Sequence, residues 1–201
     1  EMVELKCRLM PYLYQQAVYA SETGIPMLRP MFMEYPKDRT CLTLDLQYMM
    51  GESLLVAPVF KENGEADYYV PEGKWYNLLT DEVKEGGRWY TDTFDYHTMP
   101  LLVAPGKVLA LGSCCTKPDY EFAEGVTLAL SYLADGERTE AVIPNLKGEP
   151  VMHVKAERSG QKITVNVQGG NGNWSGKVLW DKDAVIEKDD SHMVITLGEG
   201  K

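Results

Sequence analysis

The sequence contains no long hydrophobic run and no excess of positive charge. None of its apolar stretches approaches the roughly 18 residues that a membrane-spanning helix requires. The formal net charge is -10, so the summed charge does not attract nucleic-acid phosphates or an anionic membrane. We therefore expect neither nucleic acid nor a membrane among the partners of this protein.

Cysteine is scarce, and its positions exclude two classes of site. The four cysteines are Cys7, Cys41, Cys114 and Cys115. They lack metal-ligand spacing, and the adjacent pair is poorly placed to form a disulfide with itself. Secreted disulfide frameworks place more cysteines in a shorter chain. The pattern predicts free thiols, a cytoplasmic location and no metal cofactor.

The composition is that of a folded globular protein. Of the 201 residues, 44% are hydrophobic and 25% are charged, which is ordinary for a soluble domain. This length allows one large domain or two small ones. The first residues, Glu1 to Glu4, carry no signal-peptide pattern and resemble the interior of a longer chain.

The first 60 residues suggest alternating helices and strands. Apolar residues at three- and four-residue steps predict one helix over Val3–Ala20, bent at Pro11. The apolar run Ile25–Met33 predicts a strand buried on both faces, as in a parallel sheet. We expect a second helix over Thr40–Met50 and a further strand over Leu54–Val59. Because so few elements cannot close a parallel sheet, this region reads as the end of a larger domain.

The sequence after Gly64 predicts short strands separated by turns, at the spacing typical of β-sandwiches. A polar, turn-rich segment, Gly112–Pro118, suggests a boundary between two β-domains. The expected strands are Asp67–Val70, Lys74–Asn77, Leu101–Val103, Val108–Leu111, Thr127–Leu133, Thr139–Ile143, Val151–Glu157, Lys162–Val167, Lys177–Trp180 and His192–Leu197.

Several motifs, in this order and spacing, resemble glycoside hydrolase family 31. The motifs are LKCRLMPYLY at 5–14, RPMFMEYP at 29–36, QYMMG at 47–51, LLVAPV at 54–59 and YVPEGKW at 69–75. The segments at 118–120 and 124–125 resemble the C-terminal part of the bacterial α-xylosidase branch of this family. One departure is Ala104, where members of the family often have an arginine.

This resemblance implies a mainly β fold with three parts. Residues 1–60 would be the last helix–strand–helix portion of a (β/α)8 catalytic barrel. Residues 61–112 would form a proximal C-terminal β-sandwich, and residues 113–201 a distal one. Family members are retaining α-glycosidases that use two carboxylates. Both aspartates precede this region in the family, so the resemblance gives no catalytic residue here.

The resemblance therefore implies a structural fragment of an α-xylosidase or α-glucosidase that is inactive in isolation. Its expected partners are the upstream catalytic barrel, the oligosaccharide substrate of the parent enzyme and further copies of the chain. No cofactor is expected. Two alternatives stay open, namely an autonomous carbohydrate-binding module and an oligomerisation domain.

Individual polar residues offer weak candidates for chemistry. Glu34 follows the expected barrel strand at the end where barrel enzymes keep their active sites, but it has no partner motif and reads as an ion-pairing loop residue. Asp45 reads as a solvent-facing or capping carboxylate. The three histidines lack metal-ligand spacing, and three serines lack a nucleophile elbow. These residues are His97, His153, His192, Ser53, Ser113 and Ser131.

Aromatic residues raise the question of sugar binding, because flat rings stack on the apolar faces of sugars. In a sandwich such residues are more often part of the core, and we predict that role for most of them. The glycine-rich segment 169–172 lacks the residues of a phosphate loop and predicts a turn. The aromatic set is Trp75, Trp89, Tyr90, Tyr96, Trp174 and Trp180.

Overall fold

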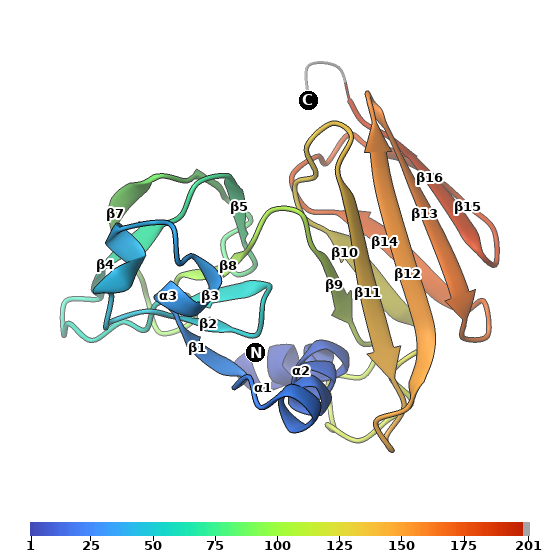
Figure 1. Cartoon of the computed structure of the whole chain (residues 1–201), viewed down its shortest axis with the longest axis horizontal. Helices are drawn as coiled ribbons and strands as arrows, with labels where there is room; N and C mark the ends of the chain where they lie inside the picture. The colour runs from blue at the N-terminus through green and yellow to red at the C-terminus, as the bar shows by residue number, and fades with distance from the viewer. Residues whose placement is uncertain (199–201) are drawn as a thin grey trace. The chain divides into compact units, whose positions relative to one another are not determined.

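Antiparallel strands make up most of the regular structure, which confirms the prediction of a mainly β protein (Figure 1). The computed structural model describes residues 1–198 of the 201. The chain forms two compact units. Unit 1 consists of Glu1–Gly24 and the described residues from Gly106 onward, and unit 2 is Ile25–Pro105. The expected domains 1–60, 61–112 and 113–201 concern a longer parent protein and stay a prediction.

Two helices begin unit 1. They are α1 (Met2–Arg8) and α2 (Met10–Thr23). The single bent helix that we expected is divided at Leu9, although Leu9 keeps helical dihedrals. Pro11 lies in the first turn of α2, where a missing N–H costs no helical hydrogen bond. Gly24 ends α2 in the left-handed conformation, as glycine commonly does.

Two sheets complete unit 1 and share one hydrophobic core. In the smaller sheet, β10 lies between β14, which runs parallel to it, and β9, which runs antiparallel. The larger sheet is antiparallel throughout in the order β11-β12-β13-β16-β15. The strands are β9 (Val108–Leu111), β10 (Val126–Leu130), β11 (Arg138–Pro144), β12 (Pro150–Ser159), β13 (Lys162–Gly169), β14 (Trp174–Val178), β15 (Val185–Lys188) and β16 (His192–Thr196).

Helix α2 packs on this core through its partly buried Met10 and Tyr14. The ring of Tyr14 lies 5.4 Å from that of Phe122, and the hydroxyl of Tyr120 donates a 2.7 Å hydrogen bond to the carbonyl of Cys7. The N-terminal helices therefore belong to the same unit as the C-terminal strands, although more than 100 residues separate these contacts in the sequence.

Unit 2 contains a six-stranded antiparallel sheet and a separate two-stranded ribbon, β4–β7. The six strands follow the order β1-β2-β3-β8-β5-β6. Its elements are β1 (Leu28–Pro30), α3 (Met31–Glu34), the 3-10 turn η1 (Thr40–Leu42), β2 (Tyr48–Met50), β3 (Leu54–Val56), β4 (Glu65–Val70), β5 (Lys74–Asn77), β6 (Val83–Glu85), β7 (Arg88–Thr93) and β8 (Leu101–Val103).

The predicted helix over Thr40–Met50 is wrong. Only one 3-10 turn forms at its start, and its end is β2, which pairs with β3. The side chain of Gln47 pairs with the backbone of Tyr69, accepting from its N–H at 2.7 Å and donating to its carbonyl at 2.8 Å. Gly51, read as a helix stop, instead has a φ of 65° in the turn between β2 and β3.

The strands predicted over Ile25–Met33 and Leu54–Val59 are shorter than expected, and their predicted parallel pairing is wrong. β1 pairs antiparallel with β2, and β3 lies antiparallel between β2 and β8. Pro30 is extended, with φ -60° and ψ 150°, and the chain turns directly into α3. Leu28 is 55% exposed, so β1 is not buried on both faces. Local hydrophobicity indicated strands, whereas distant partners set their direction.

The ribbon β4–β7 shares a core with the six-stranded sheet. Trp75 lies fully buried in this core, and its indole N–H donates a 2.8 Å hydrogen bond to the carbonyl of Pro71. Gly86 approaches the same turn so closely that a Cβ would overlap the carbonyl oxygen of Pro71. The Pro71–Gly73 and Gly86–Gly87 turns are thereby fixed against each other.

Candidate functional site

One hollow of unit 2 follows α3 and contains Glu34, the carboxylate that the sequence placed closest to a catalytic face. Its volume is about 560 Å³. Helix α3 ends at Glu34, and the next residues form an irregular loop that leads to η1. The lining residues are Glu34, Tyr35, Pro36, Lys37, Asp38, Pro71 and Glu72.

An ion pair anchors Glu34. Its carboxylate lies 2.6 Å from the guanidinium of Arg29, whose side chain is only 5% exposed. Arg29 also donates to the carbonyl of Pro26 at 2.9 Å. Arginine binds carboxylates strongly because its guanidinium presents several donors in a fixed plane. Glu34 therefore ties the end of α3 to the buried side of β1.

Asp38 organises the loop beyond α3. One carboxylate oxygen accepts from the backbone N–H of Thr40 at 3.0 Å, and the other accepts from the hydroxyl of Tyr69 at 2.9 Å. Burial raises the pKa of Tyr69, and the nearby Asp38 raises it further. Asp38 thus joins the start of η1 to strand β4.

The Cys41 thiol and the Tyr35 hydroxyl, in the same loop, have raised pKa values. Burial raises the pKa of the Cys41 thiol to about 12, and Asp38 adds to the shift. Burial also raises the pKa of Tyr35, with a further contribution from Glu34. A nucleophilic cysteine needs a lowered pKa. Cys41 is therefore a packed side chain, and its environment opposes thiolate chemistry.

The hollow offers hydrogen-bond acceptors and one ammonium group, and its arrangement suits positioning of a polar ligand. A retaining glycosidase needs two carboxyl groups about 5 to 5.5 Å apart, one to attack the anomeric carbon and one to protonate the leaving oxygen. Here Arg29 engages Glu34, while Thr40 and Tyr69 engage Asp38. The absence of a catalytic residue from this chain stays a prediction.

The other polar candidates are dispersed. Asp45 is exposed, but it lies in a loop instead of the helix that we expected. Among the serines, Ser53 and Ser131 are buried, and Ser113 donates to the carbonyl of Glu124 at 2.8 Å.

The histidines lie in both units. His97 follows β7, and His153 is exposed on β12. The ring of His192, on β16, lies 2.9 Å from the side-chain oxygen of Asn166. Within residues 1–198 no three His, Cys, Asp or Glu side chains gather in a way that could hold a metal ion.

The aromatic set divides among core, partly buried and exposed positions, which corrects part of the core prediction. Tyr90 and Trp180 are partly buried. Trp75 is 0% exposed and Trp174 is 5% exposed, as expected of core residues. By contrast, Trp89 is 56% exposed and Tyr96 is completely exposed. The predicted turn at residues 169–172 is confirmed, because it connects β13 to β14.

Sequence reasoning missed Asp38, which lines the hollow, and Tyr69, whose hydroxyl holds the Asp38 carboxylate. The Tyr-Pro-Lys-Asp run at 35–38, followed by Thr40, carries a turn and capping signal that could have indicated an ordered loop. Tyr69 could not have been found this way, because it lies 31 residues from Asp38 in the sequence.

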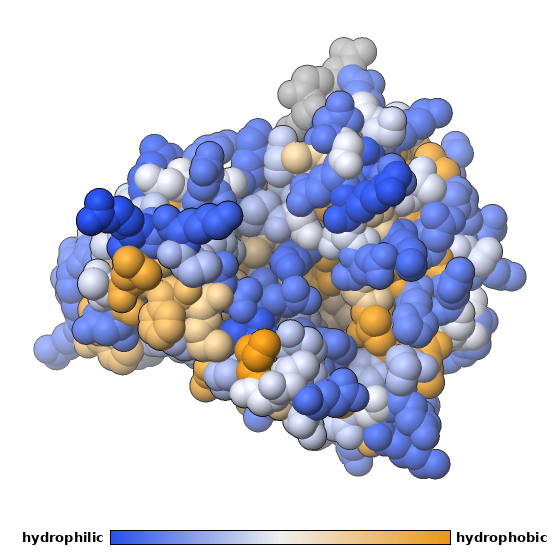
Figure 2. Space-filling view, in the orientation of Figure 1, coloured by the Kyte–Doolittle hydropathy of each residue, from blue (hydrophilic) through white to orange (hydrophobic). Residues whose placement is uncertain are grey.

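The described residues contain no helix with the length and apolar character needed to cross a membrane. Apolar side chains nevertheless gather on the surface of unit 2 over α3 (Figure 2). They include Phe32, which is 47% exposed, and Met33, which is 39% exposed. This patch lies beside the hollow, since α3 ends at Glu34.

Two family patterns match consecutive parts of the sequence. The C-terminal domain of glycosyl hydrolase family 31 matches residues 24–109, and the C-terminal domain of alpha-xylosidase YicI matches residues 121–200. The first match contains the whole hollow. The second contains most of the two packed sheets of unit 1.

Curated relatives agree with this assignment. The chain is 37% identical over 194 residues to an alpha-xylosidase of Emericella nidulans, covering 90% of this chain and 25% of the relative. It is 30% identical over 200 residues to the alpha-xylosidase XylQ of Lactiplantibacillus pentosus, covering 98% of this chain and 25% of the relative. The chain thus spans about a quarter of the length of these relatives.

The fold also occurs in a solved structure. A family 31 dextranase of Flavobacterium johnsoniae, complexed with glucose, superimposes with a TM-score of 0.75 at 22% identity. The match covers 98% of this chain and 31% of the dextranase chain. This likeness concerns the fold. The two consecutive sequence matches show that this chain belongs to the C-terminal domains of glycosyl hydrolase family 31.

Proposed function

We propose that this chain is the non-catalytic C-terminal part of a retaining α-glycosidase that removes terminal α-linked xylose or glucose from oligosaccharides. The observation that carries the proposal is the pair of consecutive matches, one of them to an alpha-xylosidase C-terminal domain. The relatives named alpha-xylosidase support xylose over glucose as the sugar released.

In this role, the N-terminal residues adjoin the catalytic barrel, and two β-domains cover and stabilise it. Strands β1, β2 and β3 pair antiparallel within the sheet of unit 2. The boundary expected between 1–60 and 61–112 would divide that sheet, so we take Ile25–Pro105 as the proximal domain.

The hollow after α3 would face the substrate cavity of the parent, since it presents the polar side chains of Glu34, Lys37 and Asp38. The ion pair of Glu34 with Arg29 and the contacts of Asp38 hold the loop after α3 in one conformation. Its contribution is to position a wall of the cavity.

The proposed partners are the upstream barrel, its oligosaccharide substrate and further copies of the same chain, in the cytoplasm. The alternatives are an autonomous carbohydrate-binding module and an oligomerisation domain. For an autonomous module, the complete product of the gene would bind sugar without hydrolysing an α-xyloside or an α-glucoside. For an oligomerisation domain, the chain would self-associate without binding sugar. Hydrolysis assays of the complete product and ultracentrifugation of the chain with and without oligosaccharide separate these outcomes from the proposed role.

Hydrolysis assays test the proposed role directly. The 201-residue chain and the complete product of its gene are incubated with p-nitrophenyl α-D-xyloside and α-D-glucoside. We expect release of p-nitrophenol by the complete product and none above background by the chain, since the reacting carboxylates lie upstream. Hydrolysis by the isolated chain that is abolished in Glu34→Gln would overturn the proposal, as would an inactive, folded complete product.

A further inference from the structure

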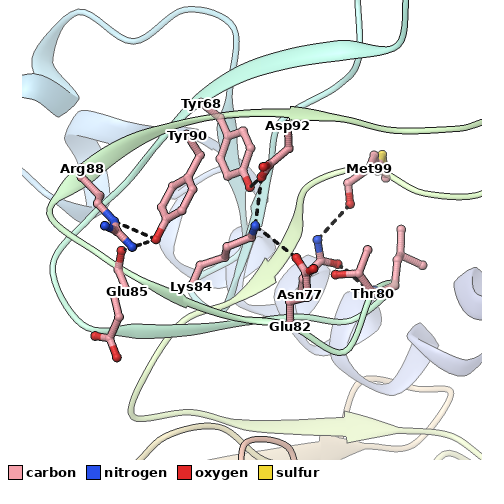
Figure 3. Close-up of polar contacts among 11 residues, drawn as sticks. Tyr68, Asn77, Thr80, Glu82, Lys84, Glu85, Arg88, Tyr90, Asp92 and Met99 are labelled. Carbon is pink, nitrogen blue, oxygen red and sulfur yellow. Dashed lines mark hydrogen bonds and ion pairs between the residues drawn. The ribbon is translucent and has the colours of Figure 1, made fainter.

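The two faces of the ribbon β4–β7 have different roles. Side chains alternate between the faces of a strand, so directly paired residues share a face. On one face the rings of Tyr68 and Tyr90 stack at 5.7 Å, and Asp92 accepts from Tyr68 at 2.7 Å. Lys84, on β6, reaches the same carboxylate at 3.0 Å (Figure 3). This face is therefore occupied by internal contacts of unit 2.

The opposite face is open to solvent except at Tyr69, which is buried. Its paired positions are Trp89 with Tyr69, Thr91 with Asp67, and Thr93 with Glu65. We call the set Glu65, Asp67, Trp89, Thr91 and Thr93 the outer strip. All of its members are exposed except Glu65, which is partly exposed. The strip extends about 13 Å from Trp89 to Thr93, since a strand rises about 3.3 Å per residue.

At one end of the strip, Trp89 is exposed yet supported from below. Its ring lies 5.8 Å from that of Tyr69 at an interplanar angle of 57°. Tyr69 is 8% exposed, and Asp38 and Gln47 hold its hydroxyl and its backbone. A large apolar ring with a fixed support loses little conformational freedom when a ligand stacks on it.

The middle of the strip is an ordered set of hydrogen-bonding groups. Lys61 forms ion pairs with Glu65 and, at 2.6 Å, with Asp67. Thr91 donates to the other oxygen of Asp67 at 2.6 Å. Lys61 and Thr91 together hold the pKa of Asp67 below its usual range, so it is an ionised acceptor at neutral pH. A carboxylate has about four acceptor sites and an ammonium three donors, which leaves capacity for a ligand.

The far end of the strip opens into a second hollow, of about 450 Å³. Asn63 lines it and accepts from the N–H of Glu65 through its side-chain oxygen at 3.1 Å, which leaves its NH2 group as a donor. Tyr96 also lines the hollow and is completely exposed. The hollow thus joins a second aromatic ring to the polar groups of the strip.

We propose that the outer strip, with Trp89 at one end and Tyr96 at the other, binds an uncharged oligosaccharide. Sugar rings present apolar faces that stack on aromatics, and their hydroxyls both donate and accept hydrogen bonds. The strip offers both features along a length that spans several sugar rings. Asp67, Glu65 and Asp95 outnumber Lys61 here, so anionic ligands such as uronic acid oligomers are repelled.

This site goes beyond the proposed function, because it lies on residues of unit 2 and needs no catalytic group. A binding experiment on the 201-residue chain can succeed or fail independently of the hydrolysis assays. The probes are a xyloglucan heptasaccharide and isomaltotriose, with trigalacturonate as the charged comparison. Binding is followed by calorimetry and by NMR signals of the Trp89 indole.

We expect both neutral probes to bind and to shift the Trp89 indole signal, and trigalacturonate to leave it unchanged. Trp89→Ala combined with Tyr96→Ala should weaken binding at least about ten-fold, because both stacking surfaces are lost. Trp89→Phe should keep most of the affinity. The matched control is Phe32→Ala, which removes an exposed ring from α3 and should leave binding unchanged.

Absence of binding by both neutral probes would overturn the proposal, as would equal affinity of the double variant or equal binding of trigalacturonate. Thermal unfolding of each variant shows whether it is folded. If the double variant does not fold, the Thr91→Val variant tests the site instead, since it removes one hydroxyl of the outer strip while keeping the shape of the side chain. It should weaken binding about three-fold or more, and unchanged binding would contradict the site.

Discussion

Unit 1 buries its apolar side chains more completely than unit 2. In unit 1 two sheets face one core, and side chains such as Leu128, Val154 and Ile163 are fully buried. In unit 2 several apolar residues near β1 and η1 remain exposed, among them Leu28, which is 55% exposed, and Leu46, which is 58% exposed. Regular strand alternation is enough to close the core of unit 1, whereas unit 2 combines short strands with irregular loops. Irregular loops of unit 2 also line its two described hollows.

The largest expected effect comes from Trp75→Ala in unit 2. Trp75 is fully buried and hydrogen-bonded to Pro71, so its removal should destabilise unit 2 by about 3–5 kcal/mol. The counterpart in unit 1 is Leu128→Ala, for which we expect about 2–5 kcal/mol. Denaturant titration with methyl NMR signals of Leu55 and Leu128 reports each unit separately. Equal loss in both units from Trp75→Ala would show that the two unfold as one.

A smaller effect is expected when the ion pair of the hollow is broken. Glu34→Gln should lower the free energy of unfolding of unit 2 by about 1.5–3 kcal/mol, because it weakens a hydrogen bond between charged groups and leaves Arg29 buried. The matched control is Asp45→Asn, on an exposed loop, with a change within about 0.5 kcal/mol. Equal denaturant midpoints of unit 2 in Glu34→Gln and Asp45→Asn would mean that the ion pair does not stabilise the loop.

Alkaline pH should destabilise the two units in sequence. The Cys41 thiol ordinarily has a pKa of 9.0, and burial raises it to about 12 in unit 2. Burial likewise raises the pKa of Tyr120, in unit 1, from 10.0 to about 12. Between the ordinary and the raised pKa, the unfolded state binds fewer protons than the folded state, so stability falls as pH rises. Unit 2 should begin to lose stability near pH 9, and unit 1 nearer pH 10.

Denaturant midpoints at pH 8, 9.5 and 11, read from the methyl signals of each unit, measure this order. Cys41→Ala should flatten the dependence of unit 2 between pH 8 and 9.5 and leave unit 1 unchanged. Above about pH 10 the tyrosines Tyr35, Tyr68 and Tyr76, whose pKa values are also raised by burial, still destabilise unit 2. Tyr120→Phe should reduce the dependence of unit 1 alone. If Cys41→Ala leaves the slope of unit 2 unchanged, the thiol is not the titrating group.

The smallest effect is expected at an exposed ion pair of unit 1. Arg138 lies 2.8 Å from Glu157 across β11 and β12, with both side chains largely exposed. Such pairs contribute little in water, so Arg138→Ala should leave the denaturant midpoint of unit 1 nearly unchanged. The change should shrink further in 1 M salt, because salt screens exposed charges. If Arg138→Ala lowered the free energy of unfolding as much as Glu34→Gln, the contrast between buried and exposed ion pairs would be contradicted.

The sequence by itself determined most of the β structure and the family. The predicted strands over Lys74–Asn77, Leu101–Val103 and Val108–Leu111 agree with the observed bounds, because alternation and turn residues are local signals. Strands β6, β7 and β15 were not predicted, since their short or polar sequences carry little hydrophobic pattern. The observed β14 begins three residues before the expected Lys177–Trp180 strand.

The tertiary structure decided strand direction, the hollow and the surface strip. The antiparallel pairing of β1, the contact of Asp38 with Tyr69 and the register of Trp89 opposite Tyr69 all join residues that are distant in the sequence. Local pattern cannot specify such pairings, because a shift of one residue in a strand exchanges its two faces. Whether Trp89 belongs to a core or to a surface was therefore fixed by strand pairing and packing.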